Sequence, residues 1–164
     1  MVLGLSLSAF TMVHVIISLI GIVTGFIVLF GLFGSHRMPG MTALFLLSTI
    51  LTSVTGFLFP RNGITPGQIV GGISLVLLVI ALVARYPLHF SGAGRWLYIV
   101  TALIAQFFNF LVLIIQSFQK IGPLKELAPT QSEPPFLIAQ VAALVLFVVL
   151  GILSLRNSAR AALT

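Results

Sequence analysis

Five long runs of apolar residues alternate with short polar segments along this chain. The runs cover, approximately, residues 9–34, 41–59, 66–86, 96–119 and 135–155. Each has roughly the 17–25 residues with which an α-helix crosses a hydrocarbon layer about 30 Å thick. The segments between them contain Pro, Gly and most of the charged residues, as turns and loops do. The pattern predicts an all-α integral membrane protein, a bundle of five transmembrane helices that forms one domain over residues 1–164.

The second run carries a dense cluster of hydroxyl side chains. Five of them fall within eight positions of its second half: Ser48, Thr49, Thr52, Ser53 and Thr55. At about 100° per residue they form two adjacent lines on a helix, and Gly56 extends one line. Hydrocarbon offers a hydroxyl no partner beyond the carbonyls of its own helix, so we expect this surface to face protein, water or a ligand.

The first run presents a comparable stripe. His14, Ser18, Gly21 and Gly25 recur at helical spacing, within about 60° of one another. Gly21 and Gly25 form a small-xxx-small pair, which lets a second helix approach closely. We expect this stripe to pack against protein, with Gly21, Gly25 and Gly56 as helix-packing residues.

Amide side chains mark the last two runs. Gln106, Asn109 and Gln116 lie within about 80° of one another on the fourth, and Gln140 is the strong hydrogen-bonding residue in the middle of the fifth. Successive helices alternate in direction, so the start of the first run, the ends of the second and fourth and the start of the fifth share one membrane face. The polar side chains therefore gather in one half of the predicted bundle.

These positions leave two interpretations open. Asn, Gln, Ser and Thr commonly hold membrane helices together through hydrogen bonds. Alternatively, the same side chains line a polar pocket for a small ligand. The predicted pocket residues are His14, Ser18, Thr52, Thr55, Asn109, Gln116 and Gln140.

The composition excludes an ordinary soluble domain. Hydrophobic residues make up 59% of the chain, charged residues 6%, and the mean hydropathy is +1.24, whereas about a quarter of a soluble domain is charged. The net charge of +6 comes from single Lys and Arg residues near the ends of apolar runs, which favours lipid headgroups and not nucleic acid as the partner. The chain has no Cys, which excludes disulfides and Cys-ligated metal centres.

The positive residues also predict an orientation. One side of the predicted bundle carries Arg37, Arg85, Arg95, Arg156 and Arg160, and the other carries Arg61, Lys120 and Lys125. The positive-inside rule therefore places the C-terminus in the cytoplasm and the N-terminus outside. The polar half is then the outer half, next to the connection that contains Glu126 and Glu133.

Motifs of catalysis and metal binding are missing from the sequence. It has no G-x-S-x-G elbow, H-E-x-x-H helix or glycine-rich phosphate loop, and no Asp, Glu or Lys in the middle of a run. His14 has no second histidine at matching depth for a bis-histidine haem, since His36 and His89 fall in loops at the opposite face. We therefore expect a non-enzymatic protein without a metal site, and quinone or haem binding through His14 is an alternative.

Three stretches characterise the chain: TSVTGFLFP at residues 52–60, FNFLVLIIQSF at 108–118 and LAPTQSEPPFLIAQ at 127–140. With them, the chain resembles small polytopic proteins of bacterial inner membranes, a class without an assigned activity. The resemblance implies a multi-pass protein of the bacterial plasma membrane. The chain differs from small multidrug transporters in lacking an intramembrane glutamate, and from the translocator-protein family in lacking its many tryptophans.

The sequence thus favours a small membrane subunit or binding protein whose outer-half pocket holds a small polar or amphipathic ligand. Because few residues lie outside the apolar runs, we expect a homo-oligomer or a subunit of a larger membrane complex. Two alternatives stay open. One is a redox protein that binds quinone or haem, and the other is a channel or transporter for a small neutral solute, for which an uncharged path of hydroxyls and amides is suited.

Overall fold

The computed structural model describes residues 1–33, 36, 38–60 and 62–160, and its regular secondary structure is entirely helical. The helices are α1 (Leu7–Phe33), α2 (Pro39–Phe57), α3 (Pro66–Arg85), α4 (Gly92–Lys120), α5 (Gly122–Leu127) and α6 (Pro134–Arg160). All except α5 are long and apolar enough to cross a membrane. The predicted all-α fold with five candidate spans is confirmed, with boundaries that differ by a few residues; Gly34, the predicted end of the first span, lies outside the described residues.

Local sequence explains where α3 begins. Pro66 occupies the first turn of α3, where its missing N–H breaks no hydrogen bond. Thr65 caps that helix: its hydroxyl accepts a hydrogen bond from the backbone N–H of Gln68, and Gln68 Oε1 accepts one from the N–H of Thr65. This capping box satisfies two backbone donors at the helix start.

The short helix α5 is an element that the hydropathy pattern did not predict. It lies in the long connection between α4 and α6, and its six residues are too few to produce a recognisable periodicity. Leu124 of α5 packs on a small apolar cluster formed by Phe118, Ala128 and Phe136. The connection is therefore folded onto the ends of the helices that it joins.

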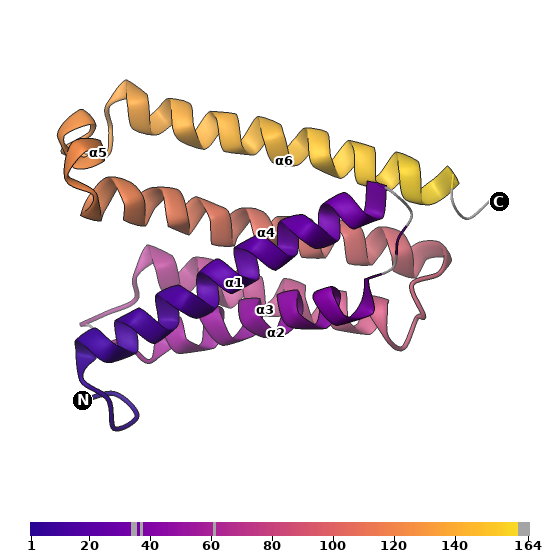
Figure 1. Ribbon diagram of the computed structural model, residues 1–164, viewed down its shortest axis with the longest axis horizontal. Helices are drawn as coiled ribbons and strands as arrows, with labels where there is room; N and C mark the ends of the chain where they lie inside the picture. Colours follow the sequence, from indigo (N-terminus) through magenta and orange to yellow (C-terminus); the bar gives the residue numbers. More distant parts are fainter. Residues whose placement is uncertain (34–35, 37, 61, 161–164) are drawn as a thin grey trace.

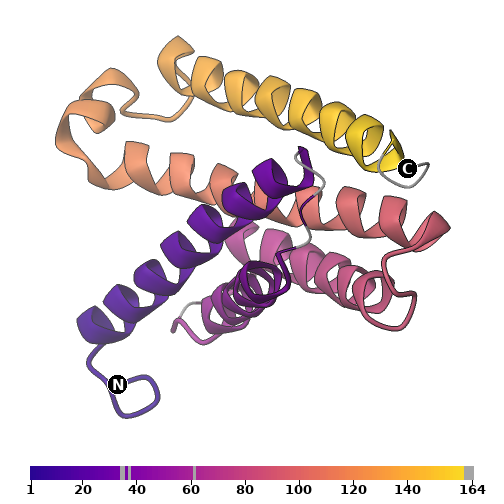
Figure 2. The same ribbon diagram turned by 45° about the vertical axis from the view of Figure 1, so that its right-hand side comes forward.

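The helix α4 occupies the centre of the arrangement, and it contacts each of the other five helices. In Figure 1, α6 runs along one side of α4, while α2 and α3 lie on the other side. The helix α1 crosses α4 obliquely, and Figure 2 shows its N-terminal half diverging from α4. Consequently α1 touches α4 over a short crossing region near the middle of both helices.

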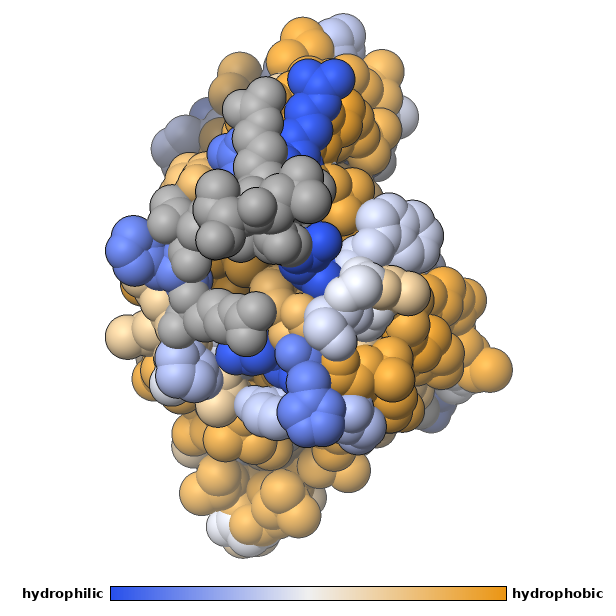
Figure 3. Space-filling model, turned by 90° about the vertical axis from the view of Figure 1, so that its right-hand side faces the viewer, coloured by the Kyte–Doolittle hydropathy of each residue, from blue (hydrophilic) through white to orange (hydrophobic). Residues whose placement is uncertain are grey.

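Apolar packing fills the space between these helices. One cluster contains residues of α1, α2, α3 and α4, among them Phe45, Leu78, Tyr98 and Ile99. An aromatic cluster joins α1, α4 and α6, with the ring of Phe147 against those of Phe26, Phe107 and Phe110 at centroid distances of 5.5–5.8 Å. Many large apolar side chains point outward instead, and they colour the flanks of the molecule in Figure 3.

Candidate functional site

Gln106 lies at the centre of the bundle. It is the central residue of α4, equally far along the chain from Gly92 and Lys120, and its side chain is 1% exposed. Its Nε2 donates a hydrogen bond of 2.7 Å to the backbone carbonyl of Ile22 in α1. A Cβ at Gly25 would lie only 2.4 Å from Gln106 Cδ, so glycine allows this approach. The amide of α4 thus packs directly on the backbone of α1.

Asn109 lies about one turn further along α4 and faces the same crossing. Its Nδ2 is 3.3 Å from the position of a Cβ on Gly21, and Thr49 Oγ1 of α2 is 3.2 Å from that position. Asn109 and Thr49 are both buried. Three helices therefore meet around Gly21, and two of them contribute polar side chains.

Two amide atoms at this crossing have no hydrogen-bond partner among the described residues. They are the acceptor Gln106 Oε1 and the donor Asn109 Nδ2, and both are buried. A buried polar group without a partner costs about 1–3 kcal/mol. The crossing of α1 and α4 thus contains an unpaired acceptor and an unpaired donor.

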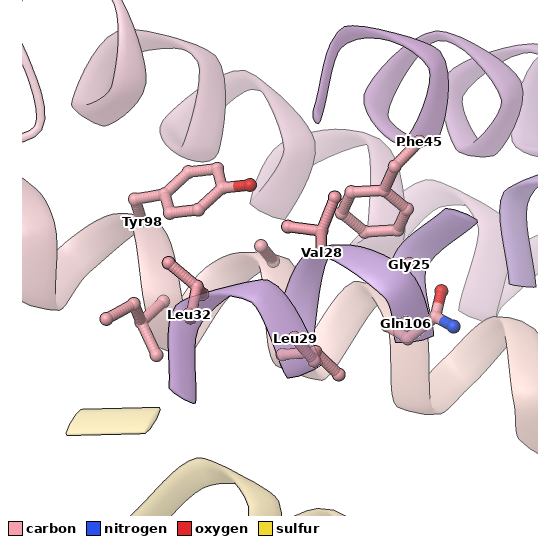
Figure 4. Close-up of a pocket in the computed structure, with 9 residues that line it drawn as sticks. Gly25, Val28, Leu29, Leu32, Phe45, Tyr98 and Gln106 are labelled. Carbon is pink, nitrogen blue, oxygen red and sulfur yellow. The ribbon is translucent and has the colours of Figure 1, made fainter. Parts of the chain in front are cut away.

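A small cavity adjoins Gln106 (Figure 4). Its volume is about 10 Å³, about enough for one water molecule. Gln106 and Tyr98 lie at its two ends in Figure 4, and the hydroxyl of Tyr98 points toward Val28 and Phe45. That hydroxyl lies near Thr42 but makes no hydrogen bond of ordinary geometry. The remaining walls are apolar side chains of α1, α2 and α4.

His14 and Thr55 form a second polar contact, between α1 and α2 and nearer the helix ends. His14 Nδ1 and Thr55 Oγ1 are 2.7 Å apart. The ring of Phe59 packs edge-on against His14 at 5.2 Å. This contact joins two of the residues predicted to line a pocket.

The other predicted pocket residues lie apart from one another. Ser18 and Thr52 donate hydrogen bonds to carbonyls of their own helices, at Val15 and Ser48. Gln116 contacts Gln119 on its own helix, with 3.5 Å between Nε2 and Oε1. Gln140 is half-buried on α6, and no hydrogen bond of its side chain occurs among the described residues. Of the seven, the structure joins His14 to Thr55 and places Asn109 at the central crossing.

Four of the five hydroxyls in the α2 cluster donate hydrogen bonds within that helix. Thr49 donates to the carbonyl of Phe45, Ser53 to that of Thr49 and Thr55 to that of Leu51. Such bonds to the preceding turn are a common solution for Ser and Thr in helices. Because these four donors are used locally, their hydroxyl oxygens remain available as acceptors toward neighbouring groups.

The predicted packing glycines differ in how tightly they are covered. Gly25 and Gly21 contact α4 as described above. The nearest atom to a Cβ on Gly56 would be His14 Cε1 at 3.9 Å, an ordinary contact distance. Among these three glycines, the close approach is therefore confined to Gly21 and Gly25.

No cluster of three His, Asp or Glu side chains that could hold a metal ion occurs in the described part of the chain. His14 lies in the N-terminal half of α1, whereas His36 and His89 belong to the α1–α2 and α3–α4 connections, which lie at the other end of the molecule (Figure 1). Quinone or haem binding through His14 thus stays a prediction.

The sequence pattern pointed only weakly to the residues that form the crossing. Gln106 shares a helix face with Asn109 but was not among the predicted pocket residues, and Thr49 was recognised only as part of the hydroxyl cluster. Their proximity depends on where α1 crosses α4. The small-xxx-small pair Gly21 and Gly25 was the signal that could have located the crossing.

A scan of protein-family models, a search of curated proteins and a search of solved structures each gave no match. The function of the protein is therefore argued from the geometry of the chain.

Proposed function

We propose that this chain is a multi-pass integral membrane protein whose helices α1, α2, α3, α4 and α6 cross the bilayer. The length and hydropathy of the five helices support insertion. So do the many large apolar side chains that they expose, which include Phe30, Val76 and Ile138 at 57–64%. In water, a surface of this kind would drive association.

The orientation that we propose places the N-terminus outside and the C-terminus in the cytoplasm of a bacterial inner membrane. The excess of positive residues on the C-terminal side supports it. Two of the arginines that enter this argument, Arg37 and Arg61, lie outside the described residues.

Within that membrane, we propose that the protein is a non-enzymatic binding protein for a small neutral polar or amphipathic ligand. The observation that carries this proposal is the unpaired acceptor of Gln106 and the unpaired donor of Asn109 at the crossing of α1 and α4. A ligand that offers one donor and one acceptor, such as an alcohol or an amide, satisfies both. A charged ligand is disfavoured, because no charged side chain lies at the middle of the five long helices, as far as they are described, to pair with it.

Binding of a molecule larger than water requires α1 to move. The cavity next to Gln106 has a volume of about 10 Å³, and Gly25 packs tightly on the Gln106 amide. Since α1 touches α4 mainly at this crossing (Figure 2), a small displacement of α1 opens the site. The ligand then donates a hydrogen bond to Gln106 Oε1 and accepts one from Asn109 Nδ2. The site proposed here lies at the centre of the bundle and shares only Asn109 with the pocket predicted in the outer half.

Native mass spectrometry of protein gently solubilised from its own membrane tests this proposal. We expect a small bound molecule that is lost in Asn109→Leu, which keeps the side-chain size and removes the amide. Gln116→Leu is the matched control, because it removes an amide from the same helix away from the crossing, and it should retain the molecule. A wild-type protein without a bound small molecule, or one that loses it equally in both variants, contradicts the proposal.

The same spectrum reports the assembly state. We propose a homo-oligomer or a subunit of a larger membrane complex, because little of the chain lies outside the helices.

The redox alternative predicts a Soret band or a bound quinone that disappears in His14→Ala. The alternative of a path for a small neutral solute gains some support from Thr42 and Thr101, which are buried in the half of the bundle that faces the cytoplasm.

A further inference from the structure

The end of α3 and the start of α4 form a tightly packed corner. A Cβ on Gly94 would lie 3.3 Å from the carbonyl oxygen of Ala84 and 2.8 Å from Leu88 Cβ, so the two helices approach closely there. Arg85 follows Ala84, and Arg95 follows Gly94. The two arginines are therefore the sequence neighbours of two residues that pack against each other, on adjacent helices at one end of the molecule.

Aromatic rings hold the side chain of Arg85 in place. Its guanidinium carbon lies 5.2 Å from the ring centroid of Phe90 and 6.0 Å from that of Tyr86. Phe90 is buried and packs against Tyr98 at a centroid distance of 5.3 Å. Guanidinium groups stack on aromatic faces and keep their N–H donors free at the edge. No hydrogen bond of the Arg85 guanidinium occurs among the described residues, so its donors remain available for a ligand.

This end of the molecule has no acidic side chain to pair with these arginines. The chain contains two acidic residues, Glu126 in α5 and Glu133 just before α6. Both lie at the opposite end of the bundle, as the position of α5 in Figure 1 shows. Figure 3 views the arginine-rich end, where hydrophilic side chains gather and hydrophobic flanks surround them. Among the described residues, no acidic side chain at this end is available to pair with these arginines.

Two exposed aromatic residues indicate the depth of the corner in the bilayer. Tyr86 is 50% exposed and Trp96 is 56% exposed, and each is the direct neighbour in sequence of one arginine. Tyr and Trp concentrate at the level of lipid headgroups. The arginine pair then lies at the depth of the phospholipid phosphates.

We propose that the corner formed by Arg85 and Arg95 binds the headgroup of an anionic phospholipid. Both guanidinium groups donate to the phosphate, and the acyl chains lie along the apolar flank beside Trp96. The inference depends on the membrane insertion proposed above. It does not depend on the central ligand site.

Trp96, the single tryptophan of the chain, reports on this corner directly. The protein is reconstituted into phosphatidylcholine vesicles with a minor fraction of phosphatidylglycerol, and bromine is placed on the acyl chains of one lipid or the other. Each arginine near a membrane surface attracts an anionic lipid on the order of fivefold, so brominated phosphatidylglycerol should quench Trp96 well beyond its share of the bilayer. High salt should leave most of this enrichment in place, since the arginines are half-buried.

Arg85→Gln and Arg95→Gln should each lose most of the preference for the brominated anionic lipid. Arg156→Gln is the matched control, because it removes one positive charge from the same end of the bundle, on α6, and it should keep the preference. Far-UV circular dichroism and the thermal midpoint check that each variant is folded.

The outcomes separate this proposal from the one on which it depends. If neither brominated lipid quenches Trp96, the corner is not in a bilayer, and the proposed membrane insertion fails. Equal quenching by both lipids shows insertion without a headgroup site and overturns the present inference. A preference that falls equally in Arg156→Gln, or disappears in high salt, shows only diffuse attraction and also overturns it.

Discussion

Gly25 is the residue on which the packing of α1 against α4 depends most directly. Its missing side chain leaves room for the amide of Gln106, which would lie 2.4–2.6 Å from a Cβ there. At Gly21 the corresponding distances are 3.2–3.4 Å, so a methyl group is less disruptive. The two glycines of one motif thus have unequal roles.

Replacement of Gly25 by Ala should weaken the bundle. The new Cβ forces Gln106 away from the carbonyl of Ile22, and overpacking of this kind costs about 1–3 kcal/mol in unfolding free energy. The measurement is reversible unfolding in mixed micelles, followed by circular dichroism. Gly40→Ala is the control, since no atom lies within 4 Å of a Cβ there, and its stability should not fall. Equal stability of both variants would contradict the close packing.

Glu133 should make the start of α6 sensitive to acid. Desolvation raises the pKa of Glu133, but hydrogen bonds from the Thr130 hydroxyl and from the N–H groups of Thr130 and Ser132 outweigh it, so the pKa lies below the ordinary 4.5. Because the pKa of Glu133 is lower in the folded protein than in the unfolded chain, the ionised carboxylate stabilises this turn fully above pH 4.5. That stabilisation is lost as the pH falls through the lower pKa of the folded state.

Hydrogen exchange of the Thr130 and Ser132 amides, corrected for intrinsic rates, measures this effect. Protection should decrease at acidic pH in the wild type and should be low at every pH in Glu133→Gln. Glu126→Gln is the control and should keep the acid dependence of the wild type. Protection that does not change with pH would show that the carboxylate is unimportant for this turn.

At the scale of elements, α2 and α4 have different roles. The hydroxyl cluster of α2 forms its hydrogen bonds with carbonyls one turn earlier, so that helix is largely self-sufficient. The amides of α4 are too long for this local arrangement and reach a neighbouring helix instead, as Gln106 does. The helix with fewer polar residues in its middle is thus the one that connects the bundle.

The contact between His14 and Thr55 should couple α1 to α2 by a modest free energy. Side-chain hydrogen bonds between membrane helices average about 0.6 kcal/mol and reach about 1.7 kcal/mol. A double-mutant cycle of His14→Leu and Thr55→Val should give a coupling energy in this range. The cycle of Ser18→Ala with Thr55→Val is the control and should give none, because Ser18 bonds to its own helix. Equal values in the two cycles would argue against the contact.

At the scale of the whole molecule, the two ends of the bundle differ in charge, whereas buried polar residues occur in both halves. Both acidic side chains lie at the end that carries α5, and the corner of Arg85 and Arg95 lies at the other (Figure 1). Buried polar residues are spread over both halves of the bundle, from Thr42 to Ser53 in α2 and from Tyr98 to Asn109 in α4. The concentration of polar groups in one half that the sequence predicted is less pronounced once burial is known.

Topology reporters should show the α3–α4 turn in the cytoplasm. Alkaline phosphatase inserted after Asn62 should be active, since the α2–α3 connection faces outward in the proposed orientation. The same insertion after His89 should be inactive, and a fluorescent protein fused to the C-terminus should fluoresce. The reverse pattern at all three positions would invert the proposed orientation, and an inconsistent pattern would contradict five crossings.

The sequence by itself determined the elements of this protein. Five apolar runs predict five long helices because length and hydropathy are local properties, and Pro66 with Thr65 defines a helix start through contacts within one turn. It also predicted Gly21 and Gly25 as helix-packing residues and Asn109 as a residue of a polar pocket. It missed α5, whose stability comes from packing on Phe118 and Phe136.

Only the tertiary structure decided which polar groups meet. The crossing of α1 over α4 brings Gln106 onto Gly25 and leaves one donor and one acceptor without a partner among the described residues, and Gly94 packs closely on Ala84, which places the neighbouring Arg85 and Arg95 on adjacent helices. Helical periodicity gives the face on which a residue lies but not the partner of that face. The partner depends on crossing angles, which result from the packing of all helices at once.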